Sequence, residues 1–308
     1  MKISSIKEIS STQGVTFIGG GTDIMPLLKN HVRTDCDFVF VKDLPELQGI
    51  AKNRGFVVIG AGESLWDISQ NEIINHELPA LAQAAAATAS PQIRNIATLG
   101  GNVMQDRRCI YFNQPESWRS ALPLCFKTGG SVCHQIPNSS VCRAIYYSDM
   151  ATALILYDAE VEYLEDGNLH REPVCDLVAR HTEANGLACG KHLPILVIRF
   201  FVPQRPDGEK SGFYKYAMRM TIDFPLTNFA LCCGNGSAKL VAGAVSTQPV
   251  VLEETAAVIS AGKSEDEVVA ACCEELKRKA KLIKEALISP AMKRELYKQI
   301  LMLLPLMR

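Results

Sequence analysis

The chain has 308 residues, of which 47% are hydrophobic and 21% are charged, and its formal net charge is −1. This composition is typical of a folded globular protein and excludes a largely disordered chain. The near-zero charge argues against a nucleic-acid partner, because binding a phosphate backbone needs an excess of Lys and Arg. The sequence contains no apolar run of about 18 residues and no apolar signal segment near Met1, so we expect a cytoplasmic protein without a membrane span.

Short apolar runs alternate with helical patterns along the first part of the chain. Strands are predicted at residues 15–18, 38–41, 56–61, 153–157 and 159–164, and helices at 24–30, 65–71 and 78–90. The first glycine run, Gly19-Gly20-Gly21-Thr22-Asp23, lies between the first strand and the first helix. Backbone N–H groups converge at such a position and favour an anion, so the run is a candidate diphosphate cradle. A tight turn that needs positive φ explains the same residues equally well.

The pattern changes after about residue 173. Strands at 195–202 and 213–218 flank a polar turn and predict a hairpin, which strands at 229–233 and 239–245 extend into a sheet. Helices are predicted at 266–286 and 290–303. We therefore place a domain boundary at 173–190, between a first domain of 1–172 and a second of 173–308. The apolar segment 300–307 is expected to dock on this second domain or on a partner subunit.

A second loop of small residues, Thr98-Leu99-Gly100-Gly101-Asn102, lies in the same predicted domain as the first glycine run. Two such loops are harder to explain as unrelated turns, so together they favour a dinucleotide site. Neither run matches Gly-x-Gly-x-x-Gly, and a Rossmann fold is therefore not indicated.

Four of the eleven cysteines lie in a short segment after the second loop, at Cys109, Cys125, Cys133 and Cys142. The total is odd and no export signal is present, so metal ligation is favoured over disulfides. Four thiolates hold either an iron–sulfur cubane or tetrahedral zinc, and this spacing does not choose between them. The remaining cysteines are interpreted as small buried thiols: Cys36, Cys175, Cys189, Cys232, Cys233, Cys272 and Cys273.

Four segments resemble the flavin-binding subunit of the molybdenum hydroxylase family: 19–23, 93–102, Ser148-Asp149 and 214–219. The resemblance implies an α+β fold, in which a two-part FAD-binding domain of the PCMH/vanillyl-alcohol-oxidase type precedes a C-terminal domain of antiparallel sheet and helices. The carbon monoxide dehydrogenase flavoprotein has this arrangement. The two parts of the first domain are expected at about 1–52 and 53–172.

The resemblance also implies which residues bind FAD. The two loops would hold the diphosphate through Gly19, Gly20, Gly21, Thr22, Asp23, Thr98, Gly100, Gly101 and Asn102. Asp149 would contact the ribose region, and Lys215 would lie beside the isoalloxazine. Without the resemblance, Asp149 is interpreted as a helix cap and Lys215 as a solvated strand residue. No catalytic residue is assigned, because no positioned base accompanies the flavin motifs.

Residues 105–145 form an insertion that most members of this family lack. The insertion and its cysteine spacing resemble the β subunit of 4-hydroxybenzoyl-CoA reductase, where they carry a 4Fe-4S cluster. The resemblance implies that the four clustered cysteines hold such a cluster here. A location inside a flavin domain favours the cluster over zinc, because a cluster transfers electrons and zinc does not.

The sequence therefore predicts an electron-transfer flavoprotein subunit, most similar to that of 4-hydroxybenzoyl-CoA reductase. Electrons would pass between an external carrier such as ferredoxin, the 4Fe-4S cluster, FAD and the 2Fe-2S clusters of a small partner subunit. A large subunit would hold molybdopterin, in a hetero-oligomer such as a dimer of heterotrimers. The alternatives are a FAD subunit of a xanthine, aldehyde or N-heterocycle dehydrogenase, an independent flavin dehydrogenase, and a scaffold that binds zinc.

Overall fold

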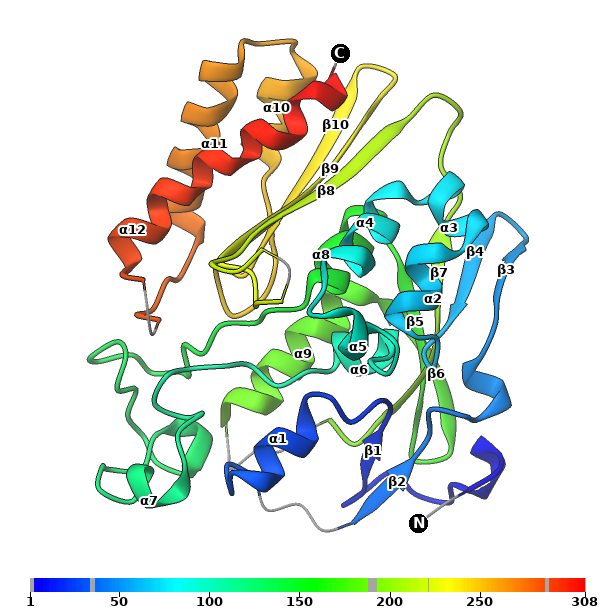
Figure 1. Ribbon diagram of the computed structural model, residues 1–308, viewed down its shortest axis with the longest axis vertical. Helices are drawn as coiled ribbons and strands as arrows, with labels where there is room; N and C mark the ends of the chain where they lie inside the picture. Colours follow the sequence, from blue (N-terminus) through cyan, green and yellow to red (C-terminus); the bar gives the residue numbers. More distant parts are fainter. Residues whose placement is uncertain (1–2, 34–36, 188–192, 221, 286–287, 308) are drawn as a thin grey trace.

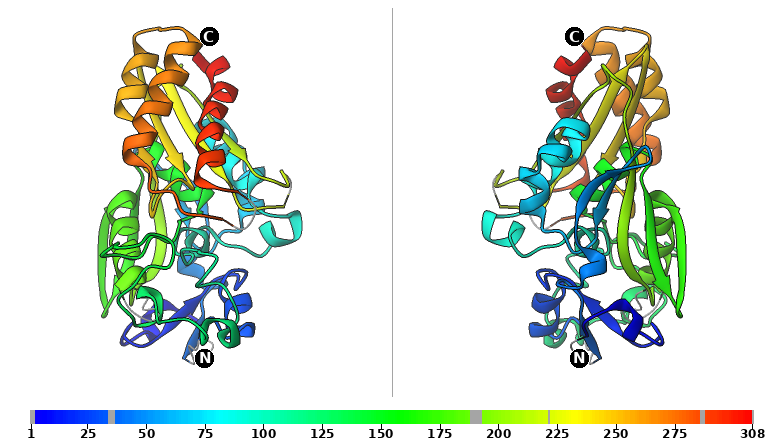
Figure 2. Two further views of the ribbon diagram at one scale, coloured as in Figure 1. Left: turned by 90° about the vertical axis from the view of Figure 1, so that its left-hand side faces the viewer. Right: turned by 90° about the vertical axis from the view of Figure 1, so that its right-hand side faces the viewer.

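A computed structural model of the chain describes residues 3–33, 37–187, 193–220, 222–285 and 288–307. Its strands form three sheets, of two, five and four strands. Figure 1 shows helices between the two larger sheets and beyond the four-stranded one. In the side views of Figure 2, the N-terminal segment and the C-terminal helices lie at opposite ends of the molecule. Antiparallel sheets packed with helices confirm the expected α+β fold.

The N-terminal segment is a small β–α–β unit. Strands β1 (Thr16–Ile18) and β2 (Phe38–Phe40) pair in parallel, and helix α1 (Ile24–Lys29) lies on the connection between them. The short 3₁₀ helices η1 (Ile6–Glu8) and η2 (Pro45–Leu47) flank this unit. All three predicted elements of this segment are thus confirmed.

The five-stranded sheet is antiparallel throughout. Its order is β3 (Ile50–Asn53), β4 (Phe56–Gly60), β7 (Leu196–Pro203), β5 (Glu160–Glu165) and β6 (Asn168–Pro173). After β4 the chain forms a series of short helices: α2 (Leu65–Gln70), α3 (Glu72–Glu77), α4 (Pro79–Ala87), α5 (Pro91–Arg94) and α6 (Leu99–Val103). Helix α4 is rich in alanine, and this lack of bulk lets it pack closely against the four-stranded sheet at β8.

The four-stranded sheet is buried on both faces. Its order is β11 (Val250–Val251), β10 (Ser237–Gly243), β9 (Thr227–Gly234) and β8 (Lys210–Tyr216). Along β9, Ala230 and Cys232 join the core shared with the five-stranded sheet, whereas Phe229 and Leu231 join a second core under the C-terminal helices. Because both faces are covered, the strand is apolar at successive positions, as the sequence shows.

The segment predicted as a strand at 153–157 is instead part of helix α8 (Asp149–Leu156), so that prediction was wrong. The Ser148 hydroxyl caps the helix by accepting the N–H of Ala151 at 3.0 Å. All eight residues of α8 are buried, because the helix lies between the two larger sheets. An apolar run without a polar face has no period that separates a helix from a strand.

The predicted hairpin between residues 195–202 and 213–218 was also wrong. Strand β7 pairs with β4 and β5, whereas β8 pairs with β9 in the other sheet. Helix α9 (Val174–Leu187) precedes β7 and packs on β5, β6 and α8. The first sheet therefore extends past the boundary expected at 173–190, and the chain changes sheets between Pro203 and Lys210.

The C-terminal region consists of α10 (Glu253–Ser260), α11 (Glu265–Lys279), α12 (Pro290–Glu295) and the 3₁₀ helix η4 (Leu296–Met307). Helix α11 ends earlier than the predicted residue 286, because Ala280 is already extended. Ile300, Leu303 and Leu304 are buried against β8, β9 and α11, so the apolar C-terminal segment docks on its own domain. No helix in the described part of the chain is long and apolar enough to cross a bilayer.

Glu275 of α11 supports the start of α10 from the side. The residue Leu252 before α10 makes no side-chain cap, and the fully buried Glu275 carboxylate instead accepts the N–H of Thr255 at 2.8 Å. Lys279 lies 2.8 Å from the same carboxylate. Burial acts to raise the pKa of Glu275, but the hydrogen bonds from Lys279 and Thr255 outweigh it and hold the pKa below its usual value.

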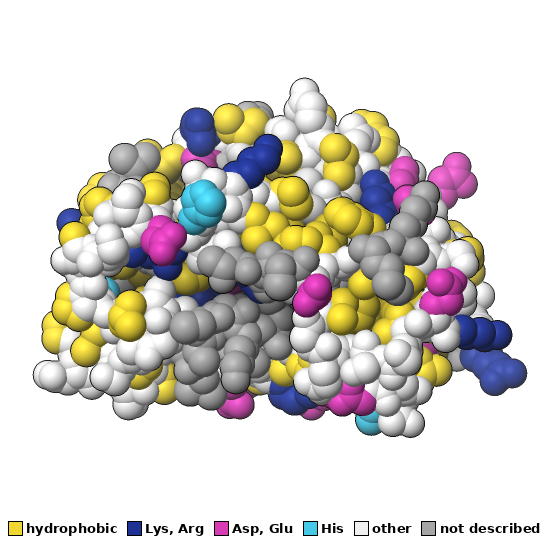
Figure 3. Space-filling view, turned by 90° about the horizontal axis from the view of Figure 1, so that it is seen from below, with side chains coloured by type: hydrophobic (Ala, Val, Ile, Leu, Met, Phe, Trp, Pro, Cys, Tyr) yellow, Lys and Arg dark blue, Asp and Glu magenta, His cyan; other side chains and the backbone are white. Residues whose placement is uncertain are grey.

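The insertion at 105–145 is mostly irregular, with only α7 (Glu116–Arg119) and η3 (Phe126–Thr128) as helices. Its two ends are joined by an antiparallel bridge, in which Arg108 and Ile145 exchange N–H···O bonds of 2.8 and 2.9 Å. Figure 1 shows it beside the N-terminal unit. The described residues on the end of the molecule seen in Figure 3 include basic, acidic and apolar side chains.

Candidate functional site

The two predicted glycine-rich loops lie directly against each other. A Cβ atom added to Gly20 would lie 2.1 Å from the carbonyl oxygen of Ile96, and one added to Gly19 would lie 2.3 Å from Thr98 Oγ1. Any side chain at these two positions would collide with the second loop. Close packing therefore explains Gly19 and Gly20, and the structure brings together the two segments that the sequence singled out.

Gly21 makes the turn itself, with φ of +69°, a region that residues with a side chain rarely adopt. The turn interpretation is correct for this glycine but does not explain the whole run. Among the described hydrogen bonds, none uses the N–H groups of Gly20, Gly21 or Thr22 as donors. Successive backbone N–H groups in a turn form a concave site for an anion. Helix α1 has six residues, so its dipole is a minor addition.

The second loop is shaped by its own side chains. Thr98 caps α6, with its Oγ1 accepting the N–H of Gly101 at 3.1 Å. Gly100 donates its N–H to the carbonyl oxygen of Ala61 at 2.9 Å, and this approach leaves no room for a side chain. Asn102 Oδ1 accepts a hydrogen bond of 2.7 Å from the Ser148 hydroxyl. Thr98 and Asn102 therefore order the loop, and they position its backbone at the cavity.

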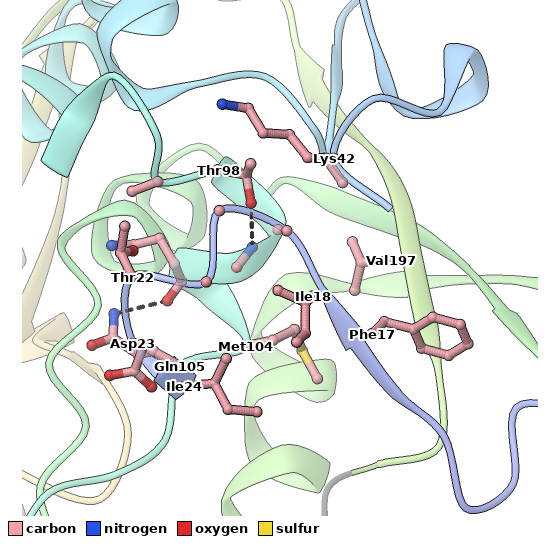
Figure 4. A pocket seen from close by; sticks show the side chains of 18 of the residues that line it. Phe17, Ile18, Thr22, Asp23, Ile24, Lys42, Thr98, Met104, Gln105 and Val197 are labelled. Atoms are coloured by element: carbon pink, nitrogen blue, oxygen red, sulfur yellow. Dashed lines mark hydrogen bonds between the residues drawn. The ribbon is translucent and has the colours of Figure 1, made fainter. Parts of the chain in front are cut away.

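A cavity of about 220 Å³ opens where the two loops meet (Figure 4). Every loop residue predicted to bind FAD lines it: Gly19, Gly20, Gly21, Thr22, Asp23, Thr98, Gly100, Gly101 and Asn102. Figure 4 shows the polar side chains of Thr22, Asp23 and Gln105 toward one end and the apolar side chains of Phe17, Ile18 and Val197 toward the other. The cavity is thus amphipathic along its length.

The apolar wall of this cavity was not predicted from the sequence. Phe17 and Ile18 directly precede the glycine run and Met104 lies two residues after the second loop, so their nearness to the motifs was an available signal. Val197 comes from β7, far along the chain, and no local pattern marks it.

Two carboxylates line the cavity, and each is paired with a cation from the insertion. Asp23 forms an ion pair with Arg108, and its other oxygen accepts the backbone N–H of Asp106 at 3.1 Å. Asp106 forms an ion pair with Lys127, and these two side chains are 2% and 1% exposed. Burial lowers the pKa of Lys127, while the neighbouring Asp106 charge opposes that shift. Arg108 also lies over the ring of Phe224, 4.5 Å from its centroid.

Asp149 and Lys215 form a buried ion pair outside this cavity lining. Lys215 Nζ lies 3.0 Å from Asp149 Oδ2 and donates to the carbonyl oxygen of Ala87 at 3.0 Å. Asp149 also accepts hydrogen bonds from Asn228 at 2.6 Å and from Thr88 at 3.3 Å. Ser148, not Asp149, caps helix α8, and Asp149 is the buried first residue of that helix, so its interpretation as a cap was wrong. The interpretation of Lys215 as a solvated residue was also wrong.

The four clustered cysteines are free thiols, each partly buried. Burial raises the pKa of the Cys109 thiol. In the described part of the chain, no group of three or more Cys, His, Asp or Glu side chains is placed to hold a metal ion. A cubane or tetrahedral zinc needs four converging ligands, so this arrangement of Cys109, Cys125, Cys133 and Cys142 does not fit either group.

The other cysteines were interpreted as buried thiols, and the structure tests five of the seven. Cys232 and Cys272 are buried, with 4% and 0% exposure, while Cys233 and Cys273 are partly buried. Cys175 is exposed at the start of α9, so the interpretation was wrong there. Cys36 and Cys189 lie outside the described residues.

The loops fit the diphosphate of a flavin dinucleotide. The N–H groups of Gly20, Gly21 and Thr22 have no described acceptor, and they belong to a loop that lines the cavity. The cavity is smaller than the roughly 300 to 1,000 Å³ typical of drug-sized ligands, so only part of the much longer FAD would lie inside it.

Three comparisons with known proteins point in the same direction. Residues 3–203 match the family described as the FAD binding domain in molybdopterin dehydrogenase. The aldehyde oxidoreductase FAD-binding subunit PaoB of Escherichia coli K12 is 30% identical over 256 residues, which are 81% of this chain and 80% of that protein. The xanthine dehydrogenase FAD-binding subunit of Escherichia coli O157:H7 is 27% identical over 252 residues, or 80% and 72% of the two chains.

A solved structure of carbon monoxide dehydrogenase from Hydrogenophaga pseudoflava is similar over 97% of this chain and 93% of the matched chain, with a TM-score of 0.73 and 17% identity. This likeness confirms the expected fold. The family match extends over most of the chain, and the 30% identical relative is covered over four fifths of its length. The chain therefore belongs to the FAD-binding medium-subunit family of the molybdenum hydroxylases, a family of oxidoreductases.

Proposed function

We propose that this chain is the FAD-binding, electron-transferring subunit of a multi-subunit molybdenum hydroxylase-type enzyme. The observation that carries the proposal is the meeting of two glycine loops at a cavity, where no described hydrogen bond uses the N–H groups of Gly20, Gly21 and Thr22. Bound FAD supplies both one-electron and two-electron exchange. The N–H groups would hold its diphosphate, and the apolar wall would cover a less polar part of the molecule.

An aldehyde or xanthine dehydrogenase complex is the type we favour. The relatives at 30% and 27% identity are the FAD-binding subunits of an aldehyde oxidoreductase and of a xanthine dehydrogenase. These relatives support the alternative drawn from the sequence better than the 4-hydroxybenzoyl-CoA reductase type. The proposed partners are a molybdopterin-binding large subunit, on which the substrate reacts, and a small subunit with 2Fe-2S clusters.

Two further assignments rest on the family resemblance. Asp149 is proposed to contact the ribose region of FAD, and Lys215 to lie by the isoalloxazine. Both are at present engaged in the buried ion pair, so such contacts require the cofactor to reach that pair.

A 4Fe-4S cluster on Cys109, Cys125, Cys133 and Cys142 also remains a proposal, supported by the cysteine spacing and the resemblance. We derive no electron-transfer step through it, because the four thiols do not converge.

Cofactor analysis of anaerobically purified protein tests both proposals at once. We expect one FAD per chain, released by acid and identified by chromatography. Iron and sulfide near four per chain, with a reduced-cubane signal in low-temperature EPR, would establish the cluster. Stoichiometric zinc or metal-free protein that still binds FAD would refute the cluster and leave the flavin proposal intact.

Assembly is tested separately, by expressing a tagged form of this chain together with the genes encoded beside it. Recovery of a complex that contains molybdenum and 2Fe-2S clusters is the expected result. A lone chain that oxidises aldehydes or purines with its own FAD would contradict the subunit proposal.

A further inference from the structure

The cavity that we assign to FAD is lined by two carboxylates, Asp23 and Asp106. This charge is unfavourable for the proposed ligand, because a diphosphate carries two negative charges and a nearby carboxylate repels it. Asp23 belongs to the glycine loop itself. Neutralising these carboxylates therefore favours diphosphate binding at the loop.

Both neutralising cations come from the cysteine insertion. Arg108 pairs with Asp23, and Lys127 pairs with Asp106. The Lys127 ammonium also donates to the carbonyl oxygen of Arg107 at 3.0 Å and lies 4.3 Å from the ring centroid of Phe112. Arg33 and Lys42, from the N-terminal segment, line the cavity as well. Positive charge at the cavity therefore comes both from this segment and from the insertion.

The insertion holds Arg108 in place through its backbone. Arg108 and Ile145 are bridged by two hydrogen bonds at the base of the insertion, next to Cys109. The adjacent Arg107, which is 1% exposed, donates to the carbonyl oxygens of Cys142 at 3.3 Å and Ala144 at 3.2 Å. The position of the Arg108 guanidinium therefore depends on how the insertion closes.

We propose that the cysteine insertion sets the FAD affinity of this subunit, with Arg108 as the residue that neutralises Asp23 at the diphosphate loop. This inference rests on the proposed function as a FAD-binding subunit. Arg108 is a positioning residue, which acts on the cofactor through the charge and orientation of Asp23. Lys127 has the same role for Asp106 on the neighbouring part of the wall.

The test is the Kd for FAD, measured by flavin fluorescence on the full chain after removal of bound flavin. We expect Arg108→Gln to raise the Kd roughly tenfold, since it leaves the Asp23 charge uncompensated beside the diphosphate. The double variant Asp23→Asn with Arg108→Gln should return close to the wild-type Kd, because no carboxylate remains to repel the ligand. A purely packing role for Arg108 does not produce this rescue.

Salt dependence gives a second readout. Repulsion between Asp23 and the diphosphate is screened by salt, so the Arg108→Gln deficit should shrink as the KCl concentration rises. Arg119→Gln is the matched control, because Arg119 also belongs to the insertion but donates to the carbonyl oxygens of Gln114 and His31. We expect its Kd for FAD to equal that of the wild type.

The outcomes separate this inference from the proposed function. Wild-type protein that binds no FAD overturns both. Tight binding by the wild type with an equal Kd for Arg108→Gln overturns the inference alone, as does a double variant as weak as the single one. If Arg108→Gln does not fold, the Asp23→Asn variant is compared with the double variant, and equal Kd values are expected.

Discussion

Replacing Lys215 with Met removes a buried cation at the junction between the helices and the four-stranded sheet. Lys215 on β8 pairs with Asp149 on α8 and donates to Ala87 at the end of α4. The two charged side chains are only 4% and 2% exposed. Methionine keeps most of the aliphatic length, so the substitution deletes charge and hydrogen bonds with little change in packing. Asp149 is left with the hydrogen bonds from Asn228 and Thr88 and no cation.

The expected loss follows from this burial. Removing one partner of a buried ion pair costs about 3 to 5 kcal/mol, because the other charge stays in the protein interior uncompensated. At roughly 2 °C per kcal/mol for a chain of this size, Lys215→Met should lower Tm by about 6 to 10 °C. The double variant with Asp149→Asn buries no charge, and the amide can still accept the hydrogen bond from Asn228. It should recover at least half of the lost stability.

Thermal melting followed by circular dichroism, with and without added FAD, measures these effects. Lys239→Met is the matched control, because Lys239 pairs with the 71% exposed Asp158 and donates to the carbonyl oxygen of Ile155 at 2.7 Å. An exposed pair contributes about 0 to 1 kcal/mol, so we expect a smaller loss than for Lys215→Met. An equal Tm for flavin-free Lys215→Met and the Lys239→Met control would contradict this expectation. So would a double variant, with Asp149→Asn added, whose Tm is no higher than that of Lys215→Met. A deficit that appears only with FAD present would instead place Lys215 at the cofactor.

Four other changes test the loops and the C-terminal region. Gly20→Ala puts a methyl group 2.1 Å from the Ile96 carbonyl oxygen, so the loops must separate and FAD retention in equilibrium dialysis should be lost. Glu275→Gln should lower stability by about 1.5 to 3 kcal/mol at neutral pH. Because the folded pKa of Glu275 lies below its usual 4.5, this deficit should persist above that pH and shrink as the pH falls through the lowered pKa. Leu304→Ser, at a position 1% exposed, should destabilise the fold by about 2 to 4 kcal/mol in urea titrations. Leu301→Ser, at a position 41% exposed, should leave stability unchanged and weaken only a complex that docks on this surface, as judged by gel filtration.

Opposite results would be informative in each case. Normal FAD retention in Gly20→Ala would mean that the loops need not touch. A Glu275→Gln deficit that grows in acid would contradict an ionised carboxylate at the start of α10. Unchanged assembly of Leu301→Ser would remove the C-terminal segment from the list of partner surfaces.

The cofactor loops could be predicted from sequence because their requirements are local. Gly19 is a glycine because the Thr98 side chain lies against it, Gly20 because the Ile96 backbone does, and Gly21 because its φ is positive. Only glycine meets these requirements, so the residue type itself indicates them. The strand and the helix that flank the run are also its neighbours in the chain. The presence of two such loops in one predicted domain favoured a shared dinucleotide site, and the family resemblance then identified the dinucleotide as FAD.

The errors share a different physical cause. Helix α8 was predicted as a strand because it is buried on every side, which removes the polar face that gives a helix its period. The partner of β7 was missed because sheet pairing is decided by strands distant in the chain, such as β4. The ion pair of Lys215 and Asp149 likewise joins residues far apart in the sequence, and no local pattern around either residue indicates its partner.

The insertion is held in place by protein contacts that do not involve thiol ligation. Lys127 is buried in its ion pair with Asp106, and Arg107 donates to the α9 carbonyl oxygen of Thr182 at 2.8 Å. On its other side, Gln135 makes two hydrogen bonds with the backbone of Lys284, at 2.9 and 3.1 Å. Many small metal-dependent domains unfold without their metal. Here the contacts of Lys127, Arg107 and Gln135 support the insertion in addition to any cluster, and they position the segment that carries Arg108.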